Sequence, residues 1–280
     1  MSFEIVPIAG ALGAEIRGID VAGLDEDGMA DVRSALLRYG VICFRDQDLS
    51  PEDYLAFARQ WGEVHLHPYL RGLDEFPEII EIIREADDPT GFADHWHTDQ
   101  IFTPLPANFT MLLARETPAA GGDTMFASLT GAYDSLSSGM QRMAAQLHTC
   151  SSYDKKAPRS ARMAARIPDR ETPTQEAIHP LVRLHPETGR AALYVSDERS
   201  TNRFDGMSEE ESRPLLAWLM RHATRPELTC RIRWEPGTLG IWDNRSVLHT
   251  ALNDYYGQRR VMHRITIRGE PVKGLAERSH

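Results

Sequence analysis

The stretch "DHWHTDQIF", residues 94–102, places two histidines and two carboxylates within six positions. If it is extended like a strand, residues two apart share a side, so His97 and Asp99 lie together and Thr98 points away. A distant third histidine would complete the two-histidine, one-carboxylate triad that non-haem iron(II) oxygenases use. His249, in "WDNRSVLHTALND", is the candidate, 150 positions after Asp99. The spacing alone leaves an ordinary polar turn open, because His-x-Asp is common and the chain has 11 histidines.

A second pattern that bears on chemistry is the strand-like stretch "RRVMHRITIRG", residues 259–269. Period-two alternation puts Arg260 and Arg264 on one face and a mostly apolar set on the other. At about 3.3 Å per residue, the two cations lie roughly 13 Å apart along the strand. They form either an anion-binding face or a solvated basic face.

The elements that must position these residues are mostly short strands. Helical spacing appears at 25–40 and 50–62, and Ser208 with Glu211 forms a capping box before a third helix. Residues 154–178 are polar and suit a long loop of the kind that covers a substrate. This pattern favours a mainly β sandwich or jelly roll over alternating β and α units. The expected strands are 41–46, 78–83, 108–115, 124–128, 147–153, 181–185, 191–196, 228–234, 238–244 and 259–269.

Composition narrows the class of protein. The formal charge, 31 − 41 = −10, argues against nucleic acid as a partner, because phosphate backbones attract basic surfaces. The sequence shows neither a secretory signal nor a run of about 20 apolar residues for a membrane helix. The three cysteines, Cys43, Cys150 and Cys230, are widely spaced and suit buried free thiols in a reducing compartment. We therefore expect one cytoplasmic domain over residues 1–280.

Four motifs, "HWHTD", "GGDT", "WDNRSVLH" and "RRVMHR", follow one another along the chain. In this order they resemble the Fe(II)/2-oxoglutarate-dependent dioxygenases of the taurine dioxygenase and 2,4-D dioxygenase (TauD/TfdA) family. The resemblance runs from "GALGAEIRGIDV" to "HRITIRG". It implies a double-stranded β-helix, a jelly-roll variant, and a homo-oligomer, either a dimer or a tetramer.

The resemblance also implies roles for single residues. The positions matching the iron ligands are His97, Asp99 and His249. Thr124 and Arg260 match residues that hold the distal carboxylate of 2-oxoglutarate, whereas Arg264 and His67 match contacts to the anionic group of the substrate. For His67 an ordinary loop histidine is an equal alternative. His95 lies outside the motif and is expected in the pocket wall, and Trp242, Asp243 and Asn244 are expected to support the strand carrying His249.

The implied reaction uses Fe(II), 2-oxoglutarate and O2, hydroxylates a substrate C–H bond and releases succinate and CO2. Where the attacked carbon bears a sulfonate, sulfate ester or ether oxygen, the product collapses to a carbonyl compound. The substrate is expected to be a small organic anion of the sulfonate, sulfate ester or aryloxyalkanoate type. Leu70 and Arg199 stand where the pocket walls of taurine enzymes are expected to be aromatic. This difference argues against taurine as the substrate. The alternatives are a zinc hydrolase, since the same donors suit Zn²⁺, and a non-catalytic anion-binding protein.

Overall fold

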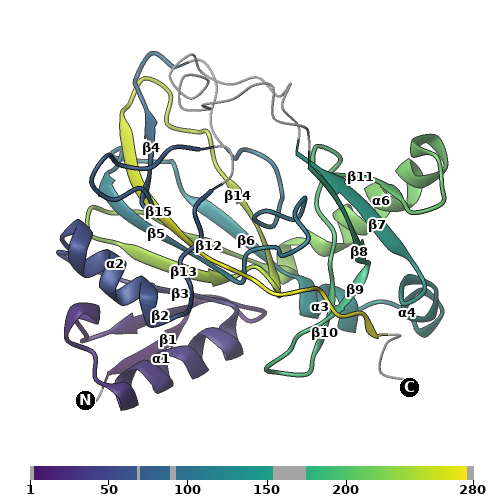
Figure 1. Cartoon of the computed structure of the whole chain (residues 1–280), viewed down its shortest axis with the longest axis horizontal. Helices are drawn as coiled ribbons and strands as arrows, with labels where there is room; N and C mark the ends of the chain where they lie inside the picture. Colours follow the sequence, from purple (N-terminus) through teal and green to yellow (C-terminus); the bar gives the residue numbers. More distant parts are fainter. Residues whose placement is uncertain (1–2, 68–69, 89–92, 154–174, 276–280) are drawn as a thin grey trace.

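A seven-stranded sheet forms the larger half of the core in the computed structural model, which describes residues 3–67, 70–88, 93–153 and 175–275 (Figure 1). Neighbouring strands are antiparallel except β2 and β3, which run parallel. The strand order is β1 (Glu4–Pro7), β2 (Ala14–Arg17), β3 (Val41–Phe44), β13 (Leu239–Asp243), β5 (Phe109–Glu116), β15 (Arg260–Ile267) and β4 (Ile80–Arg84).

A three-stranded sheet packs against the inner face of this large sheet. Its order is β12 (Thr229–Ile232), β6 (Thr124–Ser128) and β14 (Val247–Ala251). Leu112 and Met262 of the large sheet meet Phe126 and Ile232 of the small one in a buried cluster. Two β-layers that enclose an apolar core are the sandwich or jelly-roll arrangement that the strand pattern predicts.

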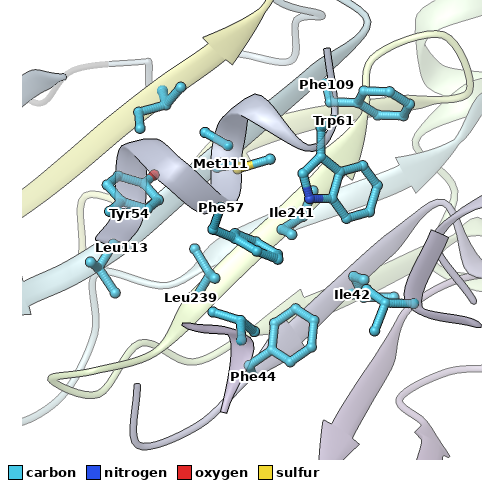
Figure 2. Close-up of a cluster of buried hydrophobic side chains, with 14 of the residues drawn as sticks. Ile42, Phe44, Tyr54, Phe57, Trp61, Phe109, Met111, Leu113, Leu239 and Ile241 are labelled. Carbon is cyan, nitrogen blue, oxygen red and sulfur yellow. The ribbon is translucent and has the colours of Figure 1, made fainter. Parts of the chain in front are cut away.

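Two helices cover the outer face of the large sheet, α1 (Glu26–Tyr39) and α2 (Pro51–Arg59). Figure 2 shows Tyr54 and Phe57 of α2, with Trp61 just beyond its end, packed on Phe109, Met111 and Ile241 of the sheet. Asp25 and Ser50 accept hydrogen bonds from the first helical turns, and Gly40 ends α1 with a φ of 73°. Both helices confirm the spacing-based predictions.

The remaining elements form a layer beside the small sheet (Figure 1). Ser208 and Glu211 make the expected capping box at the start of α6. Buried side chains of α6 and α3 meet those of β10 and β11 in a separate apolar cluster. The elements are the sheet β11 (Thr201–Phe204), β7 (His148–Ser152) and β8 (Glu176–Pro180); the pair β9 (Val182–Leu184) and β10 (Ala191–Leu193); the helices α3 (Leu129–Asp134), α4 (Ser138–Ala144) and α6 (Glu209–Ala223); and the short turn η2 (Pro226–Leu228). The other short turn, η1 (Val21–Gly23), lies beside α2, and its Val21 belongs to the apolar cluster under α1 and α2.

The structure differs from the sequence predictions in three places. Residues 94–102 are not a strand: His97 makes an isolated bridge to His249, and the chain then turns at Gln100, whose φ is 58°. β1, β2 and β11 had not been predicted, and β14, which carries His249, was expected only through the family resemblance. Most of the expected 154–178 loop lies outside the described residues, and its last three positions belong to β8.

Among the described residues, none of the helices is both apolar enough and long enough to cross a lipid bilayer.

Candidate active site

His97, Asp99 and His249 converge at one point, although the chain separates them widely. A ligand atom from each lies within 4.8 Å of the other two. The distances from Nε2 of His97 to Oδ1 of Asp99 and from Nε2 of His249 to Oδ2 of Asp99 are both 3.8 Å. The backbone produces this meeting: the amides of His97 and His249 each donate to the carbonyl of the other, at 3.0 and 2.9 Å. The three residues predicted from spacing are therefore adjacent.

The turn after His97 keeps Asp99 on the same side without a regular strand. Thr98 points the other way, and its hydroxyl donates to the Asn244 carbonyl at 2.8 Å. The amide of Asp99 donates to the Asn244 side chain at 3.2 Å. The His95 ring stacks on the His97 ring at a centroid distance of 4.7 Å, so His95 lines the site and lies outside the triad.

Thr110, which had not been predicted as a site residue, holds the Asp99 carboxylate, and Asn244 in turn holds Thr110. The Thr110 hydroxyl donates to Oδ2 of Asp99 at 2.6 Å, and Nδ2 of Asn244 donates to the Thr110 oxygen at 2.9 Å. Oδ1 of Asn244 also accepts from Nε1 of Trp242 at 3.1 Å, which fixes the amide orientation. The only sequence signal for Thr110 was a polar residue among the apolar positions of "NFTMLLAR". Asn244 supports Asp99 as well as the strand of His249.

The protonation states of the triad suit a divalent metal. Burial, followed by the charge of His249, lowers the pKa of His97 to about 3, and burial lowers the pKa of His249 to about 4. For Asp99 burial acts upward, but Arg264 and then the two imidazoles bring its pKa well below the usual range. Metal ligands must be neutral imidazoles and ionised carboxylates. All three groups are in that form at neutral pH.

The tautomer of His97 also favours coordination. Its Nδ1 lies 2.7 Å from the carbonyl oxygen of His95 and donates to it, so Nε2 keeps its lone pair and faces Asp99. A backbone acceptor on the far nitrogen is a common partner of metal-bound histidine. The donor set, two imidazoles and one carboxylate on one side, fits a non-haem iron(II) site.

The two arginines of β15 both point into the core and are buried, with exposures of 7% for Arg260 and 6% for Arg264. A solvated basic face is therefore excluded. Nη2 of Arg264 donates to Oδ1 of Asp99 at 2.7 Å, so this arginine lies directly beside the triad. Nε and Nη2 of Arg260 are buried without a hydrogen-bond partner within the described parts of the chain.

Of the other two predicted residues, Thr124 directly follows Asp123, whose charge acts on Arg260, and His67 lies near Arg264. Thr124, at the start of β6, is buried, and its oxygen accepts from Nε1 of Trp234 at 2.9 Å. His67 is half-buried, and burial followed by the charge of Arg264 lowers its pKa to about 3. The electrostatic effects of Arg264 and Asp99 place His67 near the same site.

Comparison with known proteins defines the class. The family model "Taurine catabolism dioxygenase TauD, TfdA family" matches residues 4–266, and the chain belongs to this family. The alpha-ketoglutarate-dependent sulfate ester dioxygenase of Pseudomonas putida is 34% identical over 284 residues, which cover 98% of this chain and 92% of that protein.

Solved structures agree with the fold. A taurine dioxygenase from Burkholderia xenovorans matches with a TM-score of 0.84 and 34% identity, over 99% of this chain and 92% of that one. AAD-2 in complex with Mn(II) and N-oxalylglycine matches with a TM-score of 0.78 and 28% identity, over 97% of this chain and all of that one. The mainly β, jelly-roll prediction is confirmed.

Proposed function

We propose that the chain is an Fe(II)- and 2-oxoglutarate-dependent dioxygenase that hydroxylates a small organic anion. The observation that carries the proposal is the convergence of His97, Asp99 and His249 beside two buried arginines of one strand. Alpha-ketoglutarate, the co-substrate of the P. putida relative, is 2-oxoglutarate. Neither the zinc hydrolase nor the non-catalytic binder gains support from these relatives.

The proposed roles follow from the surroundings of each side chain. When bound by the triad, Fe(II) with 2-oxoglutarate and O2 supplies the oxidising chemistry that hydroxylates a C–H bond and releases succinate and CO2. Arg260 binds the distal carboxylate of the co-substrate through its unpartnered nitrogens. Since the Thr124 oxygen accepts from Trp234, the Thr124 hydroxyl proton is left to donate to the same carboxylate.

Arg264 and His67 form the proposed contact to the primary substrate. Arg264 is tied to Asp99 through Nη2, while its buried Nε has no hydrogen-bond partner in the part of the chain that the structure describes. An anionic group held there lies beside the metal ligands, which directs the adjacent carbon to the reactive centre. A sulfate ester, a sulfonate or an aryloxyalkanoate carboxylate fits this cation, and collapse of the hydroxylated product would release a carbonyl compound.

We also propose a single catalytic domain over 1–280 that works in the cytoplasm as a homo-oligomer, either a dimer or a tetramer. The buried free thiols of Cys43, Cys150 and Cys230 suit a reducing compartment. Exposed apolar side chains such as Trp218 on α6 and Ile178 on β8 are available for contact between copies. Sedimentation velocity measures the oligomeric state, and a monomer at micromolar concentration contradicts this part.

The test of the reaction is succinate release from 2-oxoglutarate, with Fe(II) and a panel of alkyl sulfates, sulfonates and aryloxyalkanoates. We expect one class to raise succinate formation at least about tenfold above the substrate-free background, with one carbonyl product per succinate. Turnover that needs neither O2 nor 2-oxoglutarate would instead indicate a hydrolase. Iron binding with no anion-stimulated succinate would indicate a binding protein.

A further inference from the structure

A second buried arginine lies directly beside Arg260. β4 pairs with β15 so that Arg84 is the cross-strand partner of Arg260. Side chains of directly opposed residues stand on the same face of a sheet, a few ångströms apart. Arg84 is 8% exposed, so both guanidinium groups are buried on the inner face.

One aromatic residue brings the two guanidinium groups together. Tyr255 is 5% exposed, and the guanidinium carbon of Arg84 lies 4.4 Å from its ring centroid. Tyr255 also acts on Arg260, whose pKa it raises. Both cations therefore lie beside Tyr255, on the inner face of the sheet.

The charges in this cluster do not balance. Burial lowers the pKa of Arg260, Tyr255 and Asp123 act to raise it, and the positive charge of Arg84 lowers it again. Nη1 of Arg84, together with Nε and Nη2 of Arg260, has no hydrogen-bond partner in the described ranges of the chain. The neighbouring carboxylate is that of Asp123: its Oδ2 accepts from Nε of Arg231, and its buried Oδ1 has no partner in the described ranges. A single carboxylate that is already shared with Arg231 does not balance two adjacent buried cations with unused donors, and a bound anion would do so.

Unused donors alone do not identify such a site, as Arg183 shows. It is 1% exposed, and its Nε and Nη1 also lack partners within the described residues. However, its guanidinium carbon lies 5.1 Å from the Tyr194 ring centroid, and the negative charge of Asp243 acts on it. The cationic neighbour of Arg183, Arg245, is itself neutralised by Asp243. The pair formed by Arg84 and Arg260 differs because two cations oppose each other directly.

We propose that Arg84 is a second arginine of the co-substrate site and that Arg84 and Arg260 together bind the distal carboxylate of 2-oxoglutarate. The inference rests on the proposed function and adds a residue to it. A carboxylate offers two oxygens, one for the free donors of each arginine, while the Tyr255 ring packs against the Arg84 guanidinium and positions it. The pair selects a co-substrate with a second carboxylate over a 2-oxo acid without one.

Calorimetry of the full Mn(II)-loaded chain with N-oxalylglycine and with oxalate tests this assignment. Oxalate can chelate the metal but lacks the distal carboxylate. We expect Arg84→Met to weaken N-oxalylglycine binding about 10- to 100-fold, the loss expected for a charge-assisted hydrogen bond, and to change oxalate binding less than about twofold. Arg259→Met is the matched control, because Arg259 precedes Arg260 but is exposed and paired with Glu85 and Glu116. It should leave both affinities unchanged.

Thermal unfolding of the ligand-free chain separates a binding role from a structural one. Since Arg84 adds repulsion to Arg260 without an anion, Arg84→Met should leave the Tm unchanged or raise it. The variant should also lose most of the Tm increase that N-oxalylglycine gives the wild type. A lower Tm without ligand, or wild-type affinity for N-oxalylglycine, overturns the proposal.

The outcomes also separate this inference from the proposed function. If the wild-type chain binds neither N-oxalylglycine nor oxalate, the dioxygenase proposal fails and the arginine pair fails with it. If the wild type and Arg84→Met bind N-oxalylglycine equally while Arg260→Met does not, only the role of Arg84 is refuted.

Discussion

Two buried arginines, Arg245 after β13 and Arg260 in β15, show opposite ways of placing a cation inside a protein. Arg245 is 2% exposed, and each guanidinium nitrogen has a partner: Nε and Nη2 contact Asp243 at 2.8 and 2.7 Å, and Nη1 contacts Glu187 at 2.8 Å. His185 approaches the same Asp243 carboxylate at 2.9 Å. Arg260, with nearly the same burial, keeps two nitrogens unpartnered among the described residues.

This contrast distinguishes a buried arginine that stabilises the fold from one that can bind a ligand. When all donors and acceptors of a buried ion pair are used, removing one member strongly destabilises the fold, because the remaining charge stays buried without a partner. A buried cation with spare donors instead has affinity for an anion that the chain does not provide. Substitutions around Arg245 should therefore change folding stability, and substitutions around Arg260 should change ligand binding.

The largest effect on stability is expected in the ion-pair cluster of Asp243 and Arg245. Asp243→Ala leaves Arg245 buried without its main counter-ion and should lower the free energy of unfolding by about 3–5 kcal/mol. Urea denaturation followed by circular dichroism measures this. Asp134→Ala, which breaks an exposed pair with Arg190, is the control and should cost less than about 1 kcal/mol. Equal effects of the two variants would remove the distinction.

Substitutions of Arg260 and Arg264, the two arginines with unpartnered nitrogens, should each affect the binding of a different ligand. Arg260→Ala should raise the apparent KM for 2-oxoglutarate about 100-fold and change the KM of the primary substrate little. Arg264→Ala should mainly impair the use of the primary substrate, with a higher apparent KM for it. Steady-state succinate assays with each ligand varied in turn measure both. If the two variants affect both ligands equally, the assignment of one ligand to each arginine is wrong.

A smaller effect is expected at Thr110, which holds the Asp99 carboxylate. Thr110→Val keeps the shape but removes the hydroxyl, and should weaken Mn(II) affinity about 10- to 100-fold, as loss of a hydrogen bond to a metal ligand does. Thr110→Ser retains the donor and should bind Mn(II) within a few-fold of wild type. If both variants lose affinity alike, packing rather than hydrogen bonding is the cause.

The last effect depends on pH and concerns His179, a buried residue whose Nε2 lies 2.9 Å from the Ile101 carbonyl. Burial lowers its pKa to about 4, below the ordinary 6.5. As pH falls below 6.5, the unfolded chain gains a proton that the folded chain refuses, so stability falls until about pH 4. His179→Gln should reduce this slope by up to about 1.4 kcal/mol per pH unit. Unfolding free energies between pH 7 and 4.5 measure it, and an unchanged slope contradicts the assignment.

Those parts of the fold that depend on neighbouring residues could be predicted from the sequence. Helix α1 follows apolar spacing and ends at Gly40, and the capping box at Ser208 fixes the start of α6. The pairing of His97 with Asp99 was predicted for a partly wrong reason. The segment is a turn, and hydrogen bonds that Thr98 and Asp99 donate to Asn244, not strand alternation, hold its shape.

Long-range contacts account for what sequence patterns missed. Strand β14 was expected from the family resemblance and not from its own residues, since "VLHTA" gains strand geometry by pairing with β6. The support of Asp99 by Thr110 and the opposition of Arg84 to Arg260 both depend on strand register between segments far apart. Alternation placed Arg260 and Arg264 on one face, but only the fold showed that this face is buried.

Anaerobic addition of Fe(II) and 2-oxoglutarate tests the central claim most directly. We predict that the wild-type chain develops a weak visible charge-transfer band that saturates at one equivalent of iron, and that Asp99→Ala does not. A metal-loaded wild-type chain without such a band, or a band of equal strength in Asp99→Ala, would contradict a 2-oxoglutarate-binding iron site at His97, Asp99 and His249.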